Sequence, residues 1–264
     1  MSRFAKLTLT LLIVFAAIAA NARDFVVYID AGHGGSDPGA KSLYPDSCGV
    51  YSLEKDINLA VAKKLGDLMS NTKGVDVRYT RKKDYRLSLQ DRARMANNAH
   101  ADLFISIHTN SAINNPESCF GAETYVLGDE KSDKNLEVVA RENSAAEYDK
   151  NDREALREFQ QQGSAEAMLM NELIQDVRFT QSVELADQIQ KKMVSVAGRY
   201  NRGVKQSNRI YLLWATNMPS VLVELDFICN PEQEAFLISD EGQNLFAQAI
   251  YEAFLIYRQK YADR

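Results

Sequence analysis

The fold is decided by residues 25–35, which read FVVYIDAGHGG. Residues 25–29 form a short apolar run, and Asp30 and a glycine-rich stretch follow it directly. An apolar run of this length that ends at glycines predicts a buried β-strand that leads into a loop. His33 lies among these glycines, which allow a ligand to approach the backbone closely.

Helices and strands alternate along the residues that follow. Ser52 is placed to cap a helix that ends near residue 70, and residues 75–80 alternate like a strand. The Ser88/Asp91 pair predicts the capped start of another helix, before the buried apolar run 103–107. This order predicts an α/β fold with a mostly parallel twisted sheet and helices on both faces.

The second half of the chain continues the pattern. We expect strands at 121–127, 210–214 and 220–225, a helix at 180–200, and a final helix that ends near residue 261. With no internal repeat and no proline-rich linker, residues 23–264 are expected to form one domain.

Residues 129–178 differ in composition from the sequence around them. They contain 13 acidic and 7 basic residues, a net charge of −6. Leu169, Leu173 and Val177 share one apolar face of an expected helix. Connections in α/β domains are usually short, so this segment is predicted to be an inserted helical elaboration on the surface.

The first 22 residues resemble a cleaved secretion signal. Arg3 and Lys6 precede an apolar run at 7–20, and residues 20–22 supply a small-x-small cleavage site. The run is shorter than the roughly 20 residues that span a bilayer, so we expect no stable membrane span. The rest of the chain has 29 basic and 36 acidic residues, which argues against nucleic acid as a partner. The chain is therefore expected to be secreted.

Three cysteines, Cys48, Cys119 and Cys229, follow the expected cleavage site. In an oxidising compartment an odd number allows one disulfide and one thiol, with three possible pairings. The expected loop positions of Cys48 and Cys119 favour a bond between them, and three free thiols remain the alternative.

Four side chains are predicted to meet at the carboxyl edge of the sheet. His33 and His108 follow two buried strands, and Glu54 lies in the first turn of a helix. Two imidazoles and one carboxylate are a zinc ligand set that leaves a fourth position open for hydrolysis. Glu224 ends another apolar strand, where it can act as a general acid and base. Packed histidines and a solvated glutamate are the alternative; His100, at the opposite end of its strand, is expected to be structural.

Several short motifs are distributed along the whole chain. Together they resemble the zinc-dependent N-acetylmuramoyl-L-alanine amidases of the Amidase_3 family, and they lie at 29–35, 37–39, 54–59, 80–81, 91–97, 106–110 and 219–224. The resemblance implies that His33, Glu54 and His108 bind Zn²⁺ and that Glu224 is catalytic. It also implies hydrolysis of the bond between N-acetylmuramic acid and L-alanine in peptidoglycan, for cell-wall remodelling and daughter-cell separation. The expected location is then beyond the inner membrane, in the periplasm or cell envelope.

Two aspartates lie close in the sequence to the expected site residues. Asp30 is a candidate to orient the zinc ligand His33, with a plain strand-end carboxylate as the alternative. Asp226 stands where the family commonly has glycine, two positions after Glu224. A carboxylate there is expected to raise the pKa of Glu224 without loss of activity.

The acidic insertion resembles one group within the family. Residues 141–146, RENSAA, and the helical segments after them are similar to the septal AmiA/AmiB/AmiC-type amidases. The resemblance implies an autoinhibitory lid that covers the active site until a LytM-type activator displaces it. Glu142 is the candidate to reach the open zinc position, with Glu147 and Glu154 as the next choices.

Two other functions remain open at this point. A zinc peptidase or deacetylase on the same polymer would use the same ligand set. A catalytically silent envelope-binding or adaptor protein would not need all three ligands together with Glu224, so their joint presence favours an enzyme.

Overall fold

The structure is a computed structural model that describes residues 23–128, 136–161 and 165–261, with the backbone alone for residues 160–161 and 165–176. The expected leader, residues 1–22, lies outside the described residues. Six strands form one sheet in the order β2-β1-β3-β6-β4-β5. All neighbouring strands are parallel except β4 and β6. The strands are β1 (Phe25–Ala31), β2 (Val75–Tyr79), β3 (Leu103–Asn110), β4 (Ala122–Val126), β5 (Asn201–Gln206) and β6 (Ser220–Phe227).

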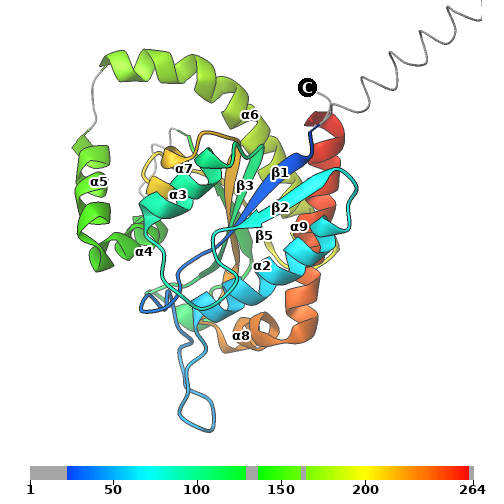
Figure 1. Ribbon diagram of the computed structural model, residues 1–264. Helices are drawn as coiled ribbons and strands as arrows, with labels where there is room; N and C mark the ends of the chain where they lie inside the picture. The colour runs from blue at the N-terminus through cyan, green and yellow to red at the C-terminus, as the bar shows by residue number, and fades with distance from the viewer. Residues whose placement is uncertain (1–22, 129–135, 162–164, 262–264) are drawn as a thin grey trace, which may run out of the picture.

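Helices cover both faces of the sheet, so the expected α/β class is confirmed (Figure 1). One face carries α2 (Glu54–Ser70), α6 (Ala165–Ser195) and α9 (Asp240–Tyr261), with α8 (Pro231–Ile238) beside them. The other face carries α3 (Leu89–Asn98), α4 (Leu136–Ser144) and α7 (Tyr211–Ala215). The remaining helical elements are η1 (Pro116–Ser118), η3 (Ala145–Tyr148) and α5 (Lys150–Gln161).

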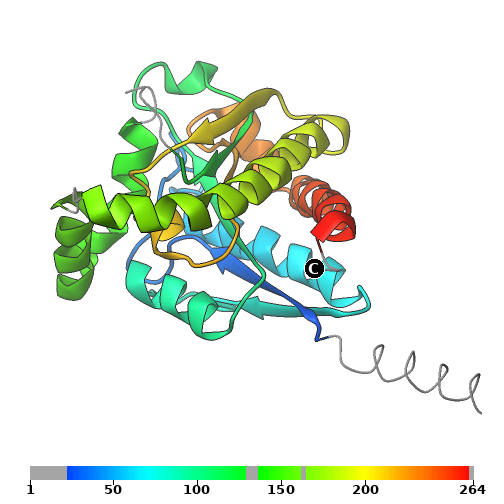
Figure 2. The same cartoon turned by 90° about the horizontal axis from the view of Figure 1, so that it is seen from above.

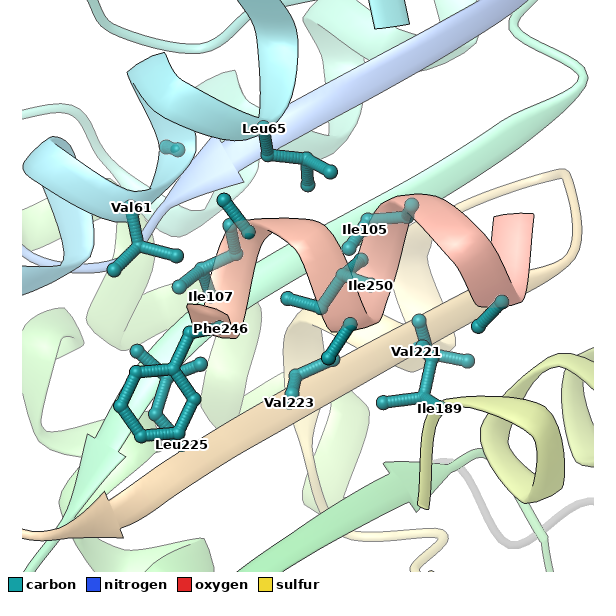
Figure 3. Packing of buried hydrophobic residues seen from close by; sticks show 14 of the residues in the cluster. Val61, Leu65, Ile105, Ile107, Ile189, Val221, Val223, Leu225, Phe246 and Ile250 are labelled. Atoms are coloured by element: carbon teal, nitrogen blue, oxygen red, sulfur yellow. The ribbon is translucent and has the colours of Figure 1, made fainter. Parts of the chain in front are cut away.

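The alternation of side chains along β3 separates the core from the candidate site. Ile105 and Ile107 point into the main apolar cluster, where they pack with Val61 of α2 and Ile250 of α9 (Figure 3). Each such buried side chain stabilises the fold by about 1.5–3 kcal/mol. His108 follows with the opposite orientation, so a rigid, fully packed strand holds it.

Two expectations about local structure are wrong. Residues 210–214 were expected to form a strand but lie in and next to helix α7, because a short apolar run does not distinguish a buried strand from a buried helix. The strand actually present is β5, a largely polar edge strand without an apolar signal. Ser52 does not cap α2; Leu53 is the N-cap residue, and the Ser52 hydroxyl donates to Glu234 at 2.6 Å.

The described residues of the acidic insertion are mostly helical, and residues 129–135 and 162–164 of it lie outside the described ranges. We call residues 136–161, which comprise α4, η3 and α5, the lid; Figure 2 shows α5 and the start of α6 projecting to one side of the sheet. The helix expected at 180–200 is the second half of the longer helix α6. Within the described ranges, no helix combines the length and the apolar character needed to cross a bilayer.

The expected Cys48–Cys119 disulfide is not present. Cys48 is exposed, Cys119 is half-buried and Cys229 is buried, and within the described residues all three are free thiols. Cys119 lies near Cys229 instead, because the Asn230 side chain on the loop after β6 donates to the Cys119 carbonyl at 3.0 Å.

Candidate metal centre

Four buried side chains converge where β1 and β3 end. His33 follows β1, His108 lies near the end of β3, Glu54 begins α2, and Glu142 comes from the lid. One ligand atom from each lies within 4.8 Å of the others. Glu54 Oε1 is 3.3 Å from His33 Nε2 and 3.1 Å from His108 Nδ1. Glu142 Oε2 is 2.6 Å from His108 Nδ1.

Two glycines make this close approach possible. A Cβ atom at Gly32 would lie 2.3 Å from the His108 ring. At Gly39, where φ is +65°, a Cβ atom would lie 2.6 Å from Glu54 Oε2 and 2.7 Å from His33 Cδ2. Any larger residue at either position would therefore push the cluster apart.

Neighbouring groups fix the orientation of the converging side chains. His33 Nδ1 is 2.9 Å from Asp37 Oδ2, which leaves Nε2 facing the cluster. Glu54 accepts hydrogen bonds from the backbone N–H groups of Ala40 at 2.7 Å and Thr109 at 3.0 Å. A ligand held in this way needs little reorganisation when it binds a metal.

The expected role of Asp30 is wrong, because Asp37 orients His33. Asp30 instead accepts hydrogen bonds from Thr80, Ser106 and Arg92 at 2.6–2.7 Å. Arg92 also donates to the His33 carbonyl at 2.6 Å, so Asp30 supports the loop backbone rather than the imidazole.

The chemistry of the cluster fits a divalent cation. Its two carboxylates bring two negative charges, which protonated imidazoles or a bound cation can balance. His33 Nε2 lies within 3.5 Å of Glu54 and Glu142 oxygens, yet among the described residues no correctly oriented hydrogen bond reaches it. Burial lowers the pKa of His108, but Glu142 and Glu54 together outweigh burial and raise that pKa to about 10. The carboxylates thus favour positive charge between the two imidazoles, and a zinc ion held by imidazole N and carboxylate O donors would supply it.

Glu224 lies beside this cluster on the neighbouring strand. It pairs with His108 in the parallel register of β3 and β6, and it is fully buried. Its Oε1 accepts a hydrogen bond from Arg141 at 3.1 Å, while Oε2 has no partner in the described part of the chain. Burial raises the pKa of Glu224 to about 8, and Glu142 also raises it, although Arg141 acts in the opposite direction.

Asp226 does not act on Glu224 as expected. Its Oδ1 accepts from the Gly121 N–H at 2.7 Å, and Arg199 lies 3.5 Å from its Oδ2. The groups with the largest effects on the pKa of Glu224 are Arg141, Glu142, His108 and Glu54, and Asp226 is not among them. Asp226 instead connects the end of β6 to the loop before β4.

The lid places two consecutive residues in the site. Glu142 is 4% exposed and contacts both imidazoles, whereas Arg141 contacts Glu224. The other two lid carboxylates considered, Glu147 and Glu154, are exposed and lie outside the cluster. The sequence singled out Glu142 but not Arg141.

Polar and aromatic contacts hold the lid against the domain. Asp152 of α5 is buried and accepts hydrogen bonds from the N–H groups of Leu89 at 2.9 Å and Gln90 at 3.1 Å, at the start of α3. Phe159 packs on Trp214 of α7, with ring centroids 4.8 Å apart. The Asp152 carboxylate of the lid therefore lies at the N-terminus of α3, where the helix dipole favours a negative charge.

Comparison with known proteins agrees with this geometry. The family model described as N-acetylmuramoyl-L-alanine amidase, Amidase_3, matches residues 27–255. YqiI of Bacillus subtilis is 34% identical over 224 residues, which are 85% of this chain and 80% of that protein. The N-acetylmuramoyl-L-alanine amidase AmiA of Escherichia coli is 32% identical over 234 residues, 88% of this chain and 75% of AmiA. The crystal structure of an N-acetylmuramoyl-L-alanine amidase from Clostridium difficile, 28% identical, superposes with a TM-score of 0.65 over 90% of this chain and 99% of that one. The chain therefore belongs to the N-acetylmuramoyl-L-alanine amidase family, Amidase_3.

Proposed function

We propose that this chain is a secreted, zinc-dependent amidase that cleaves the bond between N-acetylmuramic acid and L-alanine in peptidoglycan. The observation that carries the proposal is the convergence of His33, Glu54 and His108 beside Glu224. These three side chains come from the domain itself and would hold the zinc ion. The fourth member, Glu142, comes from the lid and would take the position that substrate needs.

The residues present can perform amide hydrolysis. Bound zinc supplies Lewis-acid activation of the carbonyl and of water. Glu224 takes a proton from the attacking water at its unpartnered Oε2 and returns it to the leaving nitrogen. Asp37 keeps His33 in one tautomer.

Metal removal tests the proposed reaction. We expect hydrolysis of purified peptidoglycan to disappear after chelation and to return when zinc is added. Zinc measured on the purified protein should approach one ion per chain. Full activity in protein that contains no metal would contradict the proposal.

We further propose that the lid is autoinhibitory. The Glu142→Ala variant is expected to raise basal hydrolysis by about tenfold or more, because a site that is closed about 99% of the time can gain up to roughly 100-fold on opening. The measurement is the initial rate on peptidoglycan without any added protein. The exposed Glu147→Ala, five residues along the same segment, is the matched control and should behave as the unaltered chain. Equal rates for all three proteins would rule out inhibition by Glu142.

Asp152 gives a second, independent test of the lid. Asp152→Ala removes two hydrogen bonds to the start of α3, each worth about 1.5–3 kcal/mol when one partner is charged. We expect faster proteolysis within the lid and a higher basal rate, although Glu142 is intact. Glu154→Ala, which removes only a surface ion pair 3.7 Å long, should change neither quantity. A lid equally resistant to protease in both variants would show that Asp152 does not hold it.

An activator of the LytM type is the proposed partner that opens the lid. Val177 is 60% exposed on α6 and can contribute to an apolar docking face, while the side chains of Leu169 and Leu173 lie outside the described residues. Differential binding of about 5.5 kcal/mol would shift a lid from 1% to 99% open. In the cell we propose a role in cell-wall remodelling and daughter-cell separation. Added activator domain should raise the rate of the unaltered chain but not that of Glu142→Ala.

The rival activities differ in their products. A zinc peptidase on peptidoglycan would release peptides by cutting between amino acids, and a deacetylase would release acetate. Family membership and the intact cluster with Glu224 favour the amidase over a catalytically silent adaptor.

A further inference from the structure

We propose that Arg141 occupies an ammonium subsite, in which the open enzyme binds the amine that leaves the scissile bond. The subsite consists of three acceptors: Glu224 Oε1, Asn110 Oδ1 and the Ser111 carbonyl oxygen. The inference rests on the proposed amidase function and adds to it a binding site for one half of the product.

The contacts of the guanidinium define the subsite. Its Nη2 donates to Asn110 Oδ1 and to Glu224 Oε1, both at 3.1 Å, and its Nη1 donates to the Ser111 carbonyl at 3.0 Å. Its Nε donates to Glu142 at 2.9 Å. Three of these four acceptors, all except Glu142, belong to the domain and not to the lid.

The acceptor of Asn110 is held in place from behind. The side chain is 1% exposed, and its Nδ2 donates to Glu123 Oε1 at 2.5 Å. Because the amide nitrogen is engaged there, Oδ1 faces Arg141. Glu123 is fixed in turn by the Tyr125 hydroxyl at 3.2 Å and by Arg202 at 3.3 Å. The three acceptors thus lie on β6, at the end of β3 and directly after it, with support from β4, and none of them belongs to the lid.

The second observation is the unsatisfied carboxylate in the same place. Glu224 is fully buried, and its Oε2 has no hydrogen-bond partner among the residues described. Oε2 is the atom proposed to take the proton of water, so once the lid opens and Arg141 leaves, Oε1 loses its donor as well. A buried acceptor without a partner costs about 1–3 kcal/mol, so the open site favours a new donor at Oε1.

The chemistry of the reaction supplies such a donor. The scissile amide nitrogen has one N–H group. Hydrolysis breaks the C–N bond, transfers the hydroxyl of water to the carbonyl carbon, and transfers the proton of water to nitrogen. The leaving L-alanine then has two N–H groups, and three once it is protonated, since the pKa of an α-amino group is about 7.7–8.0. Three acceptors therefore bind the departing amine better than the substrate amide, which lowers the barrier to bond cleavage.

The lid then resembles both products at once. Glu142 places a carboxylate against His33 and His108, as the new lactyl carboxylate would be placed. Arg141 places a cation against Glu224 and Asn110, as the new ammonium group would be placed. Consecutive residues of one helix can take both positions, because the Glu142 carboxylate reaches the two imidazoles while the Arg141 guanidinium reaches Glu224 and Asn110.

A binding experiment tests the subsite without turnover. The protein is the full-length, zinc-loaded Arg141→Ala/Glu142→Ala variant, which vacates the site. The probes are L-alaninamide, a cation, and N-acetyl-L-alaninamide, its neutral counterpart, with binding followed by NMR titration. We expect the cation to bind at least about tenfold more tightly than the neutral probe, because charged hydrogen bonds contribute about 1.5–3 kcal/mol. The unaltered chain, with Arg141 in place, should bind neither probe.

Two further variants, each added to Arg141→Ala/Glu142→Ala, test whether Asn110 is responsible for the preference for the cation. Asn110→Ser should weaken the cation about tenfold and lower kcat for peptidoglycan about tenfold, with KM changed less than twofold. Asn97→Ser, a matched change at an asparagine on α3 whose side chain bonds the backbone of Ala215 and Asn217, should change none of these values. Should Asn110→Ser fail to fold, Glu224→Gln tests the same subsite by removing its charge and should also weaken the cation.

Equal binding of the two probes would overturn the subsite, as would full discrimination after either Asn110→Ser or Glu224→Gln. Failure of the amidase reaction itself would appear differently, as intact peptidoglycan in the turnover assay. The probe titration would then still decide whether the three acceptors select a cation.

Discussion

Glu224→Gln is expected to lower kcat for peptidoglycan hydrolysis by about 10²–10⁴-fold, the usual contribution of a general acid or base. Glutamine keeps the shape of the side chain, so it can still accept from Arg141, but it cannot take up a proton. Glu224 is not one of the four clustered side chains, so zinc content should stay near one ion per chain. The measurement is kcat in the Glu142→Ala background, where the lid does not limit the rate.

The control for Glu224 is the same change at Glu234. That side chain lies on α8, accepts a hydrogen bond from Ser52 just before α2, and is not one of the four clustered side chains. Glu234→Gln should leave kcat and zinc content unchanged. Turnover near that of the parent in Glu224→Gln would remove Glu224 from the mechanism.

His108→Ala is expected to remove zinc and activity together. Loss of an outer-shell partner typically costs roughly 10–100-fold in metal affinity, and loss of a direct ligand costs more. The alanine also leaves the Glu54 and Glu142 carboxylates facing each other across a cavity. Metal analysis after dialysis against zinc-free buffer measures the first effect, and the peptidoglycan rate measures the second.

His100→Ala is the matched control for His108→Ala. His100 lies just before β3, at the opposite end of that strand from His108, and is exposed with a φ of +48°. Its replacement should preserve zinc and rate. Tightly bound zinc in His108→Ala would show that His108 is not a ligand.

The sequence predicted those strands whose burial on both faces of the sheet gives a continuous apolar run. Residues 25–29 and 103–107 are continuous apolar runs because their strands are covered on both faces, and both strands were located correctly. β5 is an edge strand with polar residues, so no run marked it. The apolar run at 210–214 was assigned to the wrong structure because α7 is a single short helix packed between α3, α4 and the sheet.

The candidate site likewise contains residues that the sequence could place and residues that it could not. His33, His108 and Glu224 could be placed because each follows or ends an apolar run, and parallel strands bring those ends to one edge. Asp37 and Arg141 could not be placed, because their partners are set by the path of a glycine loop and by how the lid docks. A local motif therefore predicts which groups reach the edge of the sheet but not which hydrogen bonds orient them.

The most direct test of the account identifies the bond that is cut. Purified peptidoglycan is digested with the zinc-loaded Glu142→Ala variant, and the new chemical ends are quantified by amine labelling and mass spectrometry. We expect equal numbers of new L-alanine amino termini and of free lactyl carboxylates on N-acetylmuramic acid. Neither should form in the presence of a chelator. Released acetate, new amino termini at other residues of the peptide, or no new ends at all would contradict it.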